Sequence, residues 1–125
     1  MATVEITTDN FEETVSSNDL VILDFWAGWC GPCVAFAPTY EKVSANYPDV
    51  VFGKIDTEAH QALAASFNIM SIPTLMIIRD QIVIFSQAGG LPESVLVDLV
   101  DKARELDMDE VRRQVAEEQA AAARG

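Results

Sequence analysis

Residues 30–33 read Cys-Gly-Pro-Cys, and this motif carries the most specific chemistry in the sequence. Cysteines three residues apart lie on the same side of a helical turn, so their sulfurs can form a disulfide with modest strain. Pro32 is tolerated in a first helical turn and Gly31 leaves room above the sulfur, which places Cys30 at a helix N-terminus. Unpaired amides and the helix dipole stabilise a thiolate there. We therefore expect Cys30 to be the attacking sulfur and Cys33 its buried partner.

Two other interpretations of the cysteine pair remain open at this point. The pair could supply half of a tetrahedral zinc site, but the sequence has no second C-x-x-C, and its one histidine, His60, falls in a separate predicted helix. The cysteines could also be buried without chemistry, although such a pair does not require Gly-Pro between its members. Because two cysteines are too few for the disulfide framework of a small secreted fold, a reversible dithiol is favoured.

A single acid, Asp24, interrupts the apolar run of residues 20–27, six positions before Cys30. The run is otherwise apolar on both of its alternating faces, which is typical of a central strand covered on both sides. An ionised carboxylate is costly to bury. The acid therefore needs an explanation in chemistry or in a specific contact.

The composition is that of an ordinary globular protein, with 125 residues, half of them apolar, and a formal net charge of −12. The length allows one domain. The acidity argues against binding to nucleic acid or to an anionic membrane surface, because both would repel it. No apolar run approaches the ~20 residues that span a bilayer, and the N-terminus lacks the basic and apolar parts of a signal peptide. We expect a cytoplasmic protein.

Hydrophobic periodicity and turn signals predict strands that alternate with helices. A short strand at residues 3–7 precedes a helix at 9–17, where Asp9 and Glu12 resemble a capping box. The later elements are the buried strand 20–27, the helix 33–47, the strand 50–56, the helix 58–67 with Thr57 as N-cap, the closely spaced strands 74–80 and 82–87, and a helix from Pro92. The last two strands indicate an antiparallel hairpin. The predicted fold class is α/β, one mixed sheet with helices on both faces.

Residues 107–125 are predicted to form an extra helix at the C-terminus. Asp107 and Glu110 make a second capping box, and Met108 and Val111 begin a thin apolar stripe. A short isolated helix is marginal in water. We expect this one to dock through its stripe and to fray at its end.

Three motifs together resemble the thioredoxin family. They are FWAGWCGPC at residues 25–33, KID at 54–56 and SIPT at 71–74. The resemblance implies the thioredoxin fold, a central mixed sheet of about five strands that ends in an antiparallel hairpin and is flanked by four helices. It implies a thioredoxin domain at residues 1–106 and a C-terminal helical extension at 107–125.

The resemblance also implies a protein-disulfide reductase that works by thiol–disulfide exchange. Cys30 would attack a disulfide in a client protein, and Cys33 would resolve the mixed disulfide, leaving a Cys30–Cys33 disulfide. An NADPH-dependent thioredoxin reductase would restore the dithiol, so we expect no bound cofactor, no metal and a monomer. An oxidase or isomerase of the same fold is the nearest alternative, but Gly31 and Pro32 favour the reducing role. A non-catalytic subunit that only holds a larger enzyme is a second alternative.

Asp24 matches the family's buried acid below the active site, where desolvation raises a carboxyl pKa. The resemblance implies that this acid takes the Cys33 proton through a water molecule. Lys54, in the adjacent predicted strand, matches the lysine near that acid. The alternative is an acid held structurally by a backbone or lysine contact.

The resemblance places a client-binding groove beside the cysteines. Pro73 is expected to be cis and to face the motif, which leaves the backbone of Ile72 free to pair with an extended client segment. Trp26 is expected to pack internally. The remaining groove residues that the resemblance implies are Trp29, Gly31, Pro32, Gly89 and Gly90.

Two positions beside the motif depart from the family pattern. Val34 stands where a basic residue is common, and Gly28 stands where a charged or larger residue is common. Both departures lower the local charge, so they bear on client preference and not on the reaction.

Overall fold

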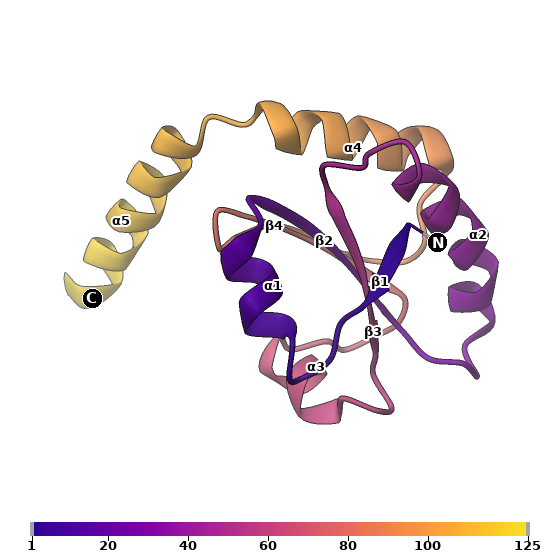
Figure 1. Cartoon of the computed structure of the whole chain (residues 1–125). Coiled ribbons are helices and arrows are strands. Elements are labelled where there is room, and N and C mark those ends of the chain that lie inside the picture. The colour runs from indigo at the N-terminus through magenta and orange to yellow at the C-terminus, as the bar shows by residue number, and fades with distance from the viewer. Residues whose placement is uncertain (1, 125) are drawn as a thin grey trace.

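The computed structural model describes residues 2–124 and builds them around one five-stranded mixed sheet (Figure 1). The strands are β1 (Thr3–Glu5), β2 (Leu20–Trp26), β3 (Val51–Asp56), β4 (Thr74–Arg79) and β5 (Ile82–Ala88). Their order is β1-β3-β2-β4-β5, where β1, β3 and β2 are parallel and β4 and β5 are antiparallel to their neighbours. The predicted mixed sheet that ends in an antiparallel hairpin is confirmed.

Helices cover both faces of this sheet, and a last helix projects away from it (Figure 1). They are α1 (Phe11–Ser17), α2 (Gly31–Ser44), α3 (Gln61–Ser66), α4 (Glu93–Glu105) and α5 (Met108–Arg124). One apolar cluster joins the sheet to α2 and α4, and a second cluster joins its other face to α1 and α3. The predicted order of elements is confirmed. Within the described residues, no helix has both the length and the apolar character to cross a membrane.

The central strand β2 is buried on both of its faces. Ile22 packs into the cluster beneath α2 and α4, whereas Leu23 and Phe25 pack into the cluster beneath α1 and α3. Asp24 shares the face of Ile22, because successive side chains of a strand point to opposite faces. The fold thereby puts the acid on the side of the sheet that α2 covers.

The first helix begins later than the predicted capping box implies. α1 starts at Phe11, and its N-cap is Asn10, whose side chain makes no capping bond. The Asn10 Oδ1 instead accepts the N–H of Thr7 at 2.7 Å, within the turn that leads into the helix. Asp9 lies in that turn and takes no part in the cap, so the prediction of Asp9 as the cap was wrong.

The third helix also begins later than predicted. α3 starts at Gln61, because residues 57–59 form a turn that Asp56 organises. The Asp56 Oδ1 accepts the N–H of Glu58 at 2.9 Å, and the Thr57 hydroxyl donates to the carbonyl of Trp26 at 3.0 Å. Thr57 therefore ties the turn to the end of β2 and does not act as the predicted N-cap.

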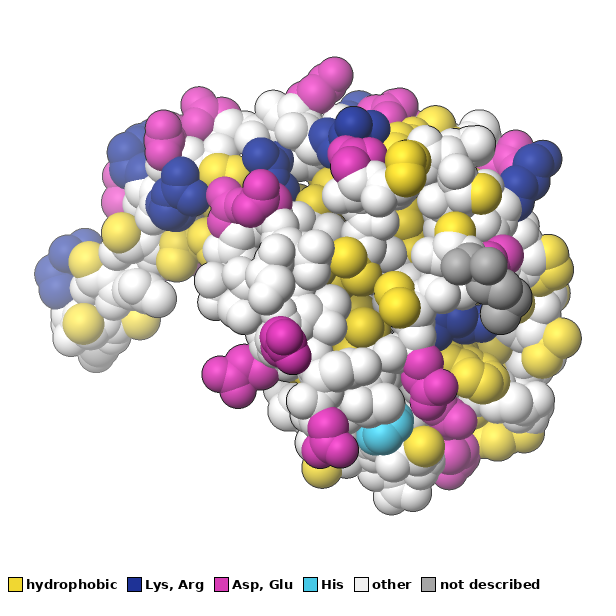
Figure 2. Space-filling model, viewed as in Figure 1, with side chains coloured by type: hydrophobic (Ala, Val, Ile, Leu, Met, Phe, Trp, Pro, Cys, Tyr) yellow, Lys and Arg dark blue, Asp and Glu magenta, His cyan; other side chains and the backbone are white. Residues whose placement is uncertain are grey.

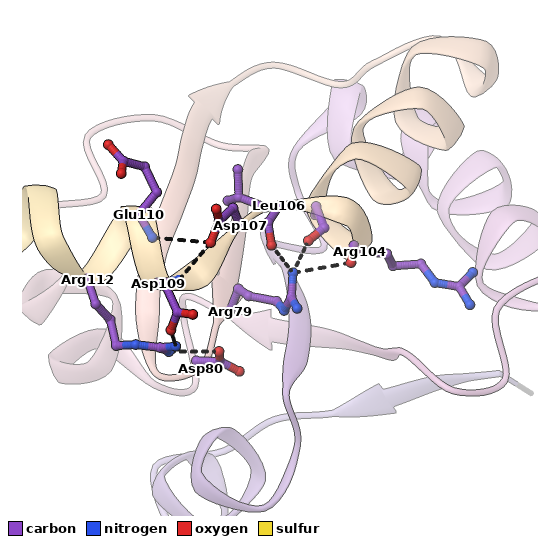
Figure 3. A network of polar contacts seen from close by, with 9 residues as sticks. Arg79, Asp80, Arg104, Leu106, Asp107, Asp109, Glu110 and Arg112 are labelled. Carbon is purple, nitrogen blue, oxygen red and sulfur yellow. Dashed lines mark hydrogen bonds and ion pairs between the residues drawn. The ribbon is translucent and has the colours of Figure 1, made fainter.

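The helix α5 begins at Met108, directly after Asp107, the residue that the sequence predicted as its cap. The Asp107 Oδ1 lies 3.1 Å from the backbone nitrogen of Asp109 and 3.2 Å from that of Glu110, and it accepts from both (Figure 3). Glu110 does not complete the capping box, because its carboxylate pairs with Arg113 one turn further on. Met108 is buried at the start of this helix. The predicted docking through the stripe is thus confirmed at its first residue.

Two arginines fasten this end of the chain to the sheet (Figure 3). The Arg79 Nη1, at the end of β4, donates to the carbonyl of Ala103 at 2.6 Å, which satisfies one of the free carbonyls at the end of α4. The Arg112 Nη1 pairs with the Asp80 Oδ2 at 3.2 Å. Beyond these contacts α5 projects away from the body of the protein, and it is helical throughout where the sequence predicted fraying (Figure 1). The alanine-rich sequence and the ion pairs between side chains three or four residues apart both stabilise this helix.

The turn between β4 and β5 holds two residues in the left-handed region. Asp80 has φ 51° and Gln81 has φ 66°, and the flanking Arg79 and Ile82 pair with each other. Two central residues with positive φ define a type I′ turn, the connection whose twist matches that of a hairpin. Glycine or asparagine normally fills these positions. The sequence predicted the hairpin, but it carries no glycine that would have indicated this turn type.

We predict that Gln81→Gly raises the free energy of unfolding by about 1 kcal/mol, because a side chain with a Cβ is strained in the left-handed region and glycine is not. Urea unfolding followed by circular dichroism measures the change. Ser86→Gly, in the extended part of β5, is the matched control and should lower the free energy of unfolding by about 0.5–1 kcal/mol. A loss of stability in Gln81→Gly would contradict the role assigned to backbone strain in this turn.

Candidate active site

The two cysteines lie at the start of α2, just after the loop that follows β2. Cys30 is the N-cap of α2 and Cys33 lies in its first turn, and their sulfurs form a disulfide across a Cα–Cα distance of 5.3 Å. Cys30 is 4% exposed and Cys33 is 2% exposed, so exposure alone does not separate their roles. A surface cleft does separate them, because Cys30 lines it and Cys33 is not among its lining residues. A molecule that enters the cleft meets Cys30 first.

Backbone groups at the helix start act on the sulfur of Cys30. The N–H of Cys33 donates to the Cys30 Sγ at 3.2 Å, and Pro32, at the second helical position, has no N–H. The N-cap position also lies at the positive end of the helix dipole. Once the disulfide is reduced, these effects stabilise a negative charge on the Cys30 sulfur.

The cleft beside Cys30 has a volume of about 470 Å³. Trp29, which is 72% exposed, and Met70 give it an apolar and accessible rim. The Ile72 carbonyl oxygen lies 3.7 Å from the Cys30 Sγ, and the Ile72–Pro73 bond is cis, as the resemblance implied. Exposed apolar side chains around a reactive group are typical of a surface that binds another molecule.

The structure brings most of the expected groove residues together. Gly31 and Pro32 line the cleft with Trp29 and Ile72. Gly89 has φ 101° and donates its N–H to the carbonyl of Pro73 at 2.7 Å, so it lies against the residue that follows the cleft-lining Ile72. A Cβ on Gly90 would come within 3.2 Å of Phe36, so this glycine allows the loop to approach α2 closely.

Asp24 is 1% exposed, and neither of its carboxylate oxygens has a hydrogen-bond partner among the described residues. Burial raises the pKa of Asp24 from an ordinary value of 3.8 to about 6, and the positive charge of Lys54 lowers it in part. Lys54 stands opposite Asp24 in the parallel ladder between β2 and β3. The carboxyl group can therefore release and take up a proton close to neutral pH.

Lys54 and Trp26 lie together near this acid. The Lys54 Nζ is 4.9 Å from the centroid of the Trp26 ring, which is a cation–π arrangement. Trp26 is partly buried and packs against the cluster that contains Ala27 and the two cysteines, so it has the packing role predicted from the sequence. The lysine is thereby held beside the acid without a direct hydrogen bond to it.

Tyr40 is a polar member of the site that the sequence did not reveal. Its hydroxyl oxygen lies 3.0 Å from the carbonyl oxygen of Ile22 and 2.8 Å from that of Gly53, and its single proton serves one of them at a time. Burial, and then the negative charge of Asp24, raise the pKa of Tyr40 well above its ordinary value. The neutral phenol links α2 to both strands that carry Asp24 and Lys54.

Glu58 is a second residue of the site that no sequence signal selects. The Trp29 Nε1 donates to the Glu58 Oε1 at 2.6 Å, across a sequence separation of 29 residues. This bond places a carboxylate at the rim of the cleft. Asp56, at the end of β3, organises the turn from which Glu58 reaches the indole.

A disulfide of the C-x-x-C type at the start of a helix, next to the central strand of a βαβ unit, defines a thiol–disulfide oxidoreductase. Comparison with known proteins agrees with this class. A family model described as thioredoxin matches residues 2–102. The putative thioredoxin 2 of Streptomyces coelicolor is 58% identical over 121 residues, which cover 97% of this chain and 90% of that protein. The thioredoxin of Bacillus subtilis is 38% identical over 103 residues, which cover 82% of this chain and 98% of that one.

Solved structures give the same result. A mutant thioredoxin from Halobacterium salinarum superposes with a TM-score of 0.78 and 31% identity over 84% of this chain and 93% of that chain. The short form of spinach chloroplast thioredoxin f has a TM-score of 0.75 and 33% identity over 82% of this chain and 93% of that chain. The chain belongs to the thioredoxin family, and it is a thiol–disulfide oxidoreductase.

We predict that Asp24→Asn stabilises the protein at neutral pH and much less in acid. A carboxyl whose pKa is raised from 3.8 to about 6 on folding favours the folded state less as the pH rises through this interval. Well below pH 3.8 the group is protonated in both states, and above about pH 7 its removal should raise the free energy of unfolding by up to ~3 kcal/mol. Urea unfolding at the two pH values measures the difference.

A second substitution, Lys54→Gln, tests the same titrating group in the opposite direction. Because the charge of Lys54 lowers the pKa of Asp24, its removal should extend the loss of stability to higher pH. Equal stabilisation by Asp24→Asn in acid and at neutral pH would rule out a buried group that titrates between these values.

Proposed function

We propose that this chain reduces disulfides in client proteins, with Cys30 as the attacking sulfur and Cys33 as the resolving one. The observation that carries this assignment is the position of the Cys30 Sγ, which accepts the N–H of Cys33 at 3.2 Å and also borders the cleft. The thiolate is stabilised where a client disulfide can reach it. Cys33 lies behind it, in the first turn of α2.

The exchange proceeds in two steps that balance in electrons and protons. The Cys30 thiolate attacks one client sulfur, which breaks the client disulfide, forms a mixed disulfide and releases the other client sulfur as a thiolate that takes up a proton. Cys33 then loses its proton and attacks the Cys30 Sγ, which breaks the mixed disulfide and releases the second client sulfur. The client gains two electrons and two protons, and the protein holds the Cys30–Cys33 disulfide.

Asp24 is proposed as the group that takes the Cys33 proton, through a water molecule. Its face of β2 is the one that α2 covers, and a pKa of about 6 leaves most of the carboxyl ionised at neutral pH, yet basic enough to accept a proton. The nearby charge of Lys54 keeps it ionised. The alternative of a structurally held acid has less support, because no described residue donates a hydrogen bond to Asp24.

The client is proposed to bind as an extended segment beside the cysteines. The backbone of Ile72, next to Pro73, borders the cleft and offers groups for strand-like pairing, while Trp29 and Gly89 flank it. Recycling by a thioredoxin reductase is a general property of the family, and we propose an NADPH-dependent reductase as the source of electrons. We also propose that the protein is a monomer and meets these partners in the cytoplasm.

The division of the chain is proposed to follow function. Residues 1–106 make the redox domain, and residues 107–125 make an accessory extension. The Streptomyces coelicolor relative matches 121 of the 125 residues, so most of α5 lies within that match. The match of 103 residues covers 98% of the Bacillus subtilis thioredoxin, so that protein has almost no residues outside the match that could form such an extension.

We predict that Cys33→Ser traps client proteins as mixed disulfides through Cys30, because attack remains possible and resolution does not. Thiol-blocked lysate passed over the immobilised variant, washed, and eluted with dithiothreitol gives the measurement. Cys30→Ser is the matched control and should retain almost nothing. Equal trapping by the two variants would contradict the assignment of Cys30 as the attacking sulfur and Cys33 as the resolving one.

We predict that a chain ending at Leu106 folds and reduces disulfides within about tenfold of the full-length protein, a barrier change below ~1.4 kcal/mol. All of the proposed site residues precede residue 91. The truncation removes the buried Met108, so its free energy of unfolding should fall by up to ~1.5–3 kcal/mol. NADPH-coupled reduction of a protein disulfide by a thioredoxin reductase measures the activity. A larger loss in a chain that circular dichroism shows to be folded would mean that the extension takes part in the reaction.

A further inference from the structure

The rim of the cleft carries one carboxylate that is held in place. Glu58 is exposed, yet its Oε1 accepts the Trp29 Nε1–H at 2.6 Å. Its second carboxylate oxygen has no partner among the described residues, and no lysine or arginine there forms an ion pair with it. The carboxylate is therefore held against Trp29, which lines the cleft with Cys30, and its second oxygen is free to accept from another molecule.

The loops around the cleft contain one other charged side chain. Residues 26–38 and 88–92 carry no charged side chain, and residues 56–73 carry two acids, Asp56 and Glu58, and no lysine or arginine. Asp56 keeps its charge, but its Oδ1 accepts backbone N–H groups within the turn and does not bond to a residue that lines the cleft. At the lower edge of the molecule, Figure 2 shows acidic side chains and a histidine, with a basic side chain directly above them. Of the two acids in these loops, Glu58 is the one that bonds to a residue lining the cleft, Trp29.

We propose that Glu58 determines specificity for clients that carry lysine or arginine next to the attacked cysteine. The proposal rests on the proposed function, since it concerns the client that Cys30 attacks. A client cation at this position would meet the free oxygen of Glu58 and the exposed face of the Trp29 indole, which attracts cations as well. Because the indole already restrains the carboxylate, less side-chain entropy is lost when the pair forms than for an ordinary surface ion pair.

The net charge of −12 attracts cations to the whole surface, so the test must isolate this one carboxylate. Three disulfide-containing peptides are made that differ only in the residue beside the attacked cysteine, which is lysine, glutamine or glutamate. The reduced protein is mixed with each peptide in the absence of any reductase, at low salt, and the second-order rate constant of peptide reduction is measured. The ratio of the lysine to the glutamine rate constant reports the preference.

We expect this ratio to be about threefold to fivefold in the native protein, the range of one well-placed surface ion pair, and to fall when salt screens the charges. Glu58→Gln should bring the ratio close to one. Glu105→Gln, which removes the same charge from the exposed end of α4, should leave the ratio as in the native protein.

Two results would overturn the proposal. One is a ratio near one in the native protein, and the other is a preference for the lysine peptide that survives in Glu58→Gln. Reduction of the glutamine peptide separates this failure from failure of the proposed function, because a protein that is no disulfide reductase leaves all three peptides oxidised. Glu58→Asp keeps the charge but shortens the side chain, so a ratio equal to that of the native protein would overturn the role of the Trp29 hydrogen bond.

Discussion

The burial of β2 on both faces is the constraint on which the redox site depends. A shift of one residue in a strand moves every side chain to the opposite face of the sheet. In β2 such a shift would place Asp24 beneath α1 and α3 and put large apolar residues under the cysteines. Two separate apolar clusters oppose that shift. The same packing that stabilises the fold therefore fixes which side of the sheet receives the acid.

Polar groups inside this core are few and are joined across elements. The Tyr40 hydroxyl, from α2, contacts backbone carbonyls of both β2 and β3, and these strands carry Asp24 and Lys54. A buried phenol that bonds to the sheet holds the helix at a set height and rotation above it. Because Cys33 belongs to the same helix, the distance from the cysteines to the acid follows from this contact as well as from apolar packing.

The sequence predicted those features that depend on local pattern. The buried strand around Asp24, the helix start at Cys30 and the hairpin of β4 and β5 each leave a periodic or spacing signal in neighbouring residues. The bond between Trp29 and Glu58 left none, because it joins two exposed residues from distant loops. The late start of α1 and the left-handed Gln81 were missed for a related reason. Before α1 the backbone follows the bond between Thr7 and Asn10, and at Gln81 it follows the strand pairing of Arg79 with Ile82. Residue preferences predict neither.

The anchored but projecting α5 gives the molecule an uneven shape. Its 17 residues make a helix of about 25 Å, whereas a domain of ~100 residues has a radius of gyration near 13 Å. In Figure 1, α5 leaves the body on the side opposite α2. Rotational diffusion should therefore be anisotropic, slower about axes across the helix than about the long axis. Amide relaxation rates in the sheet would then depend on how each N–H bond is oriented relative to α5.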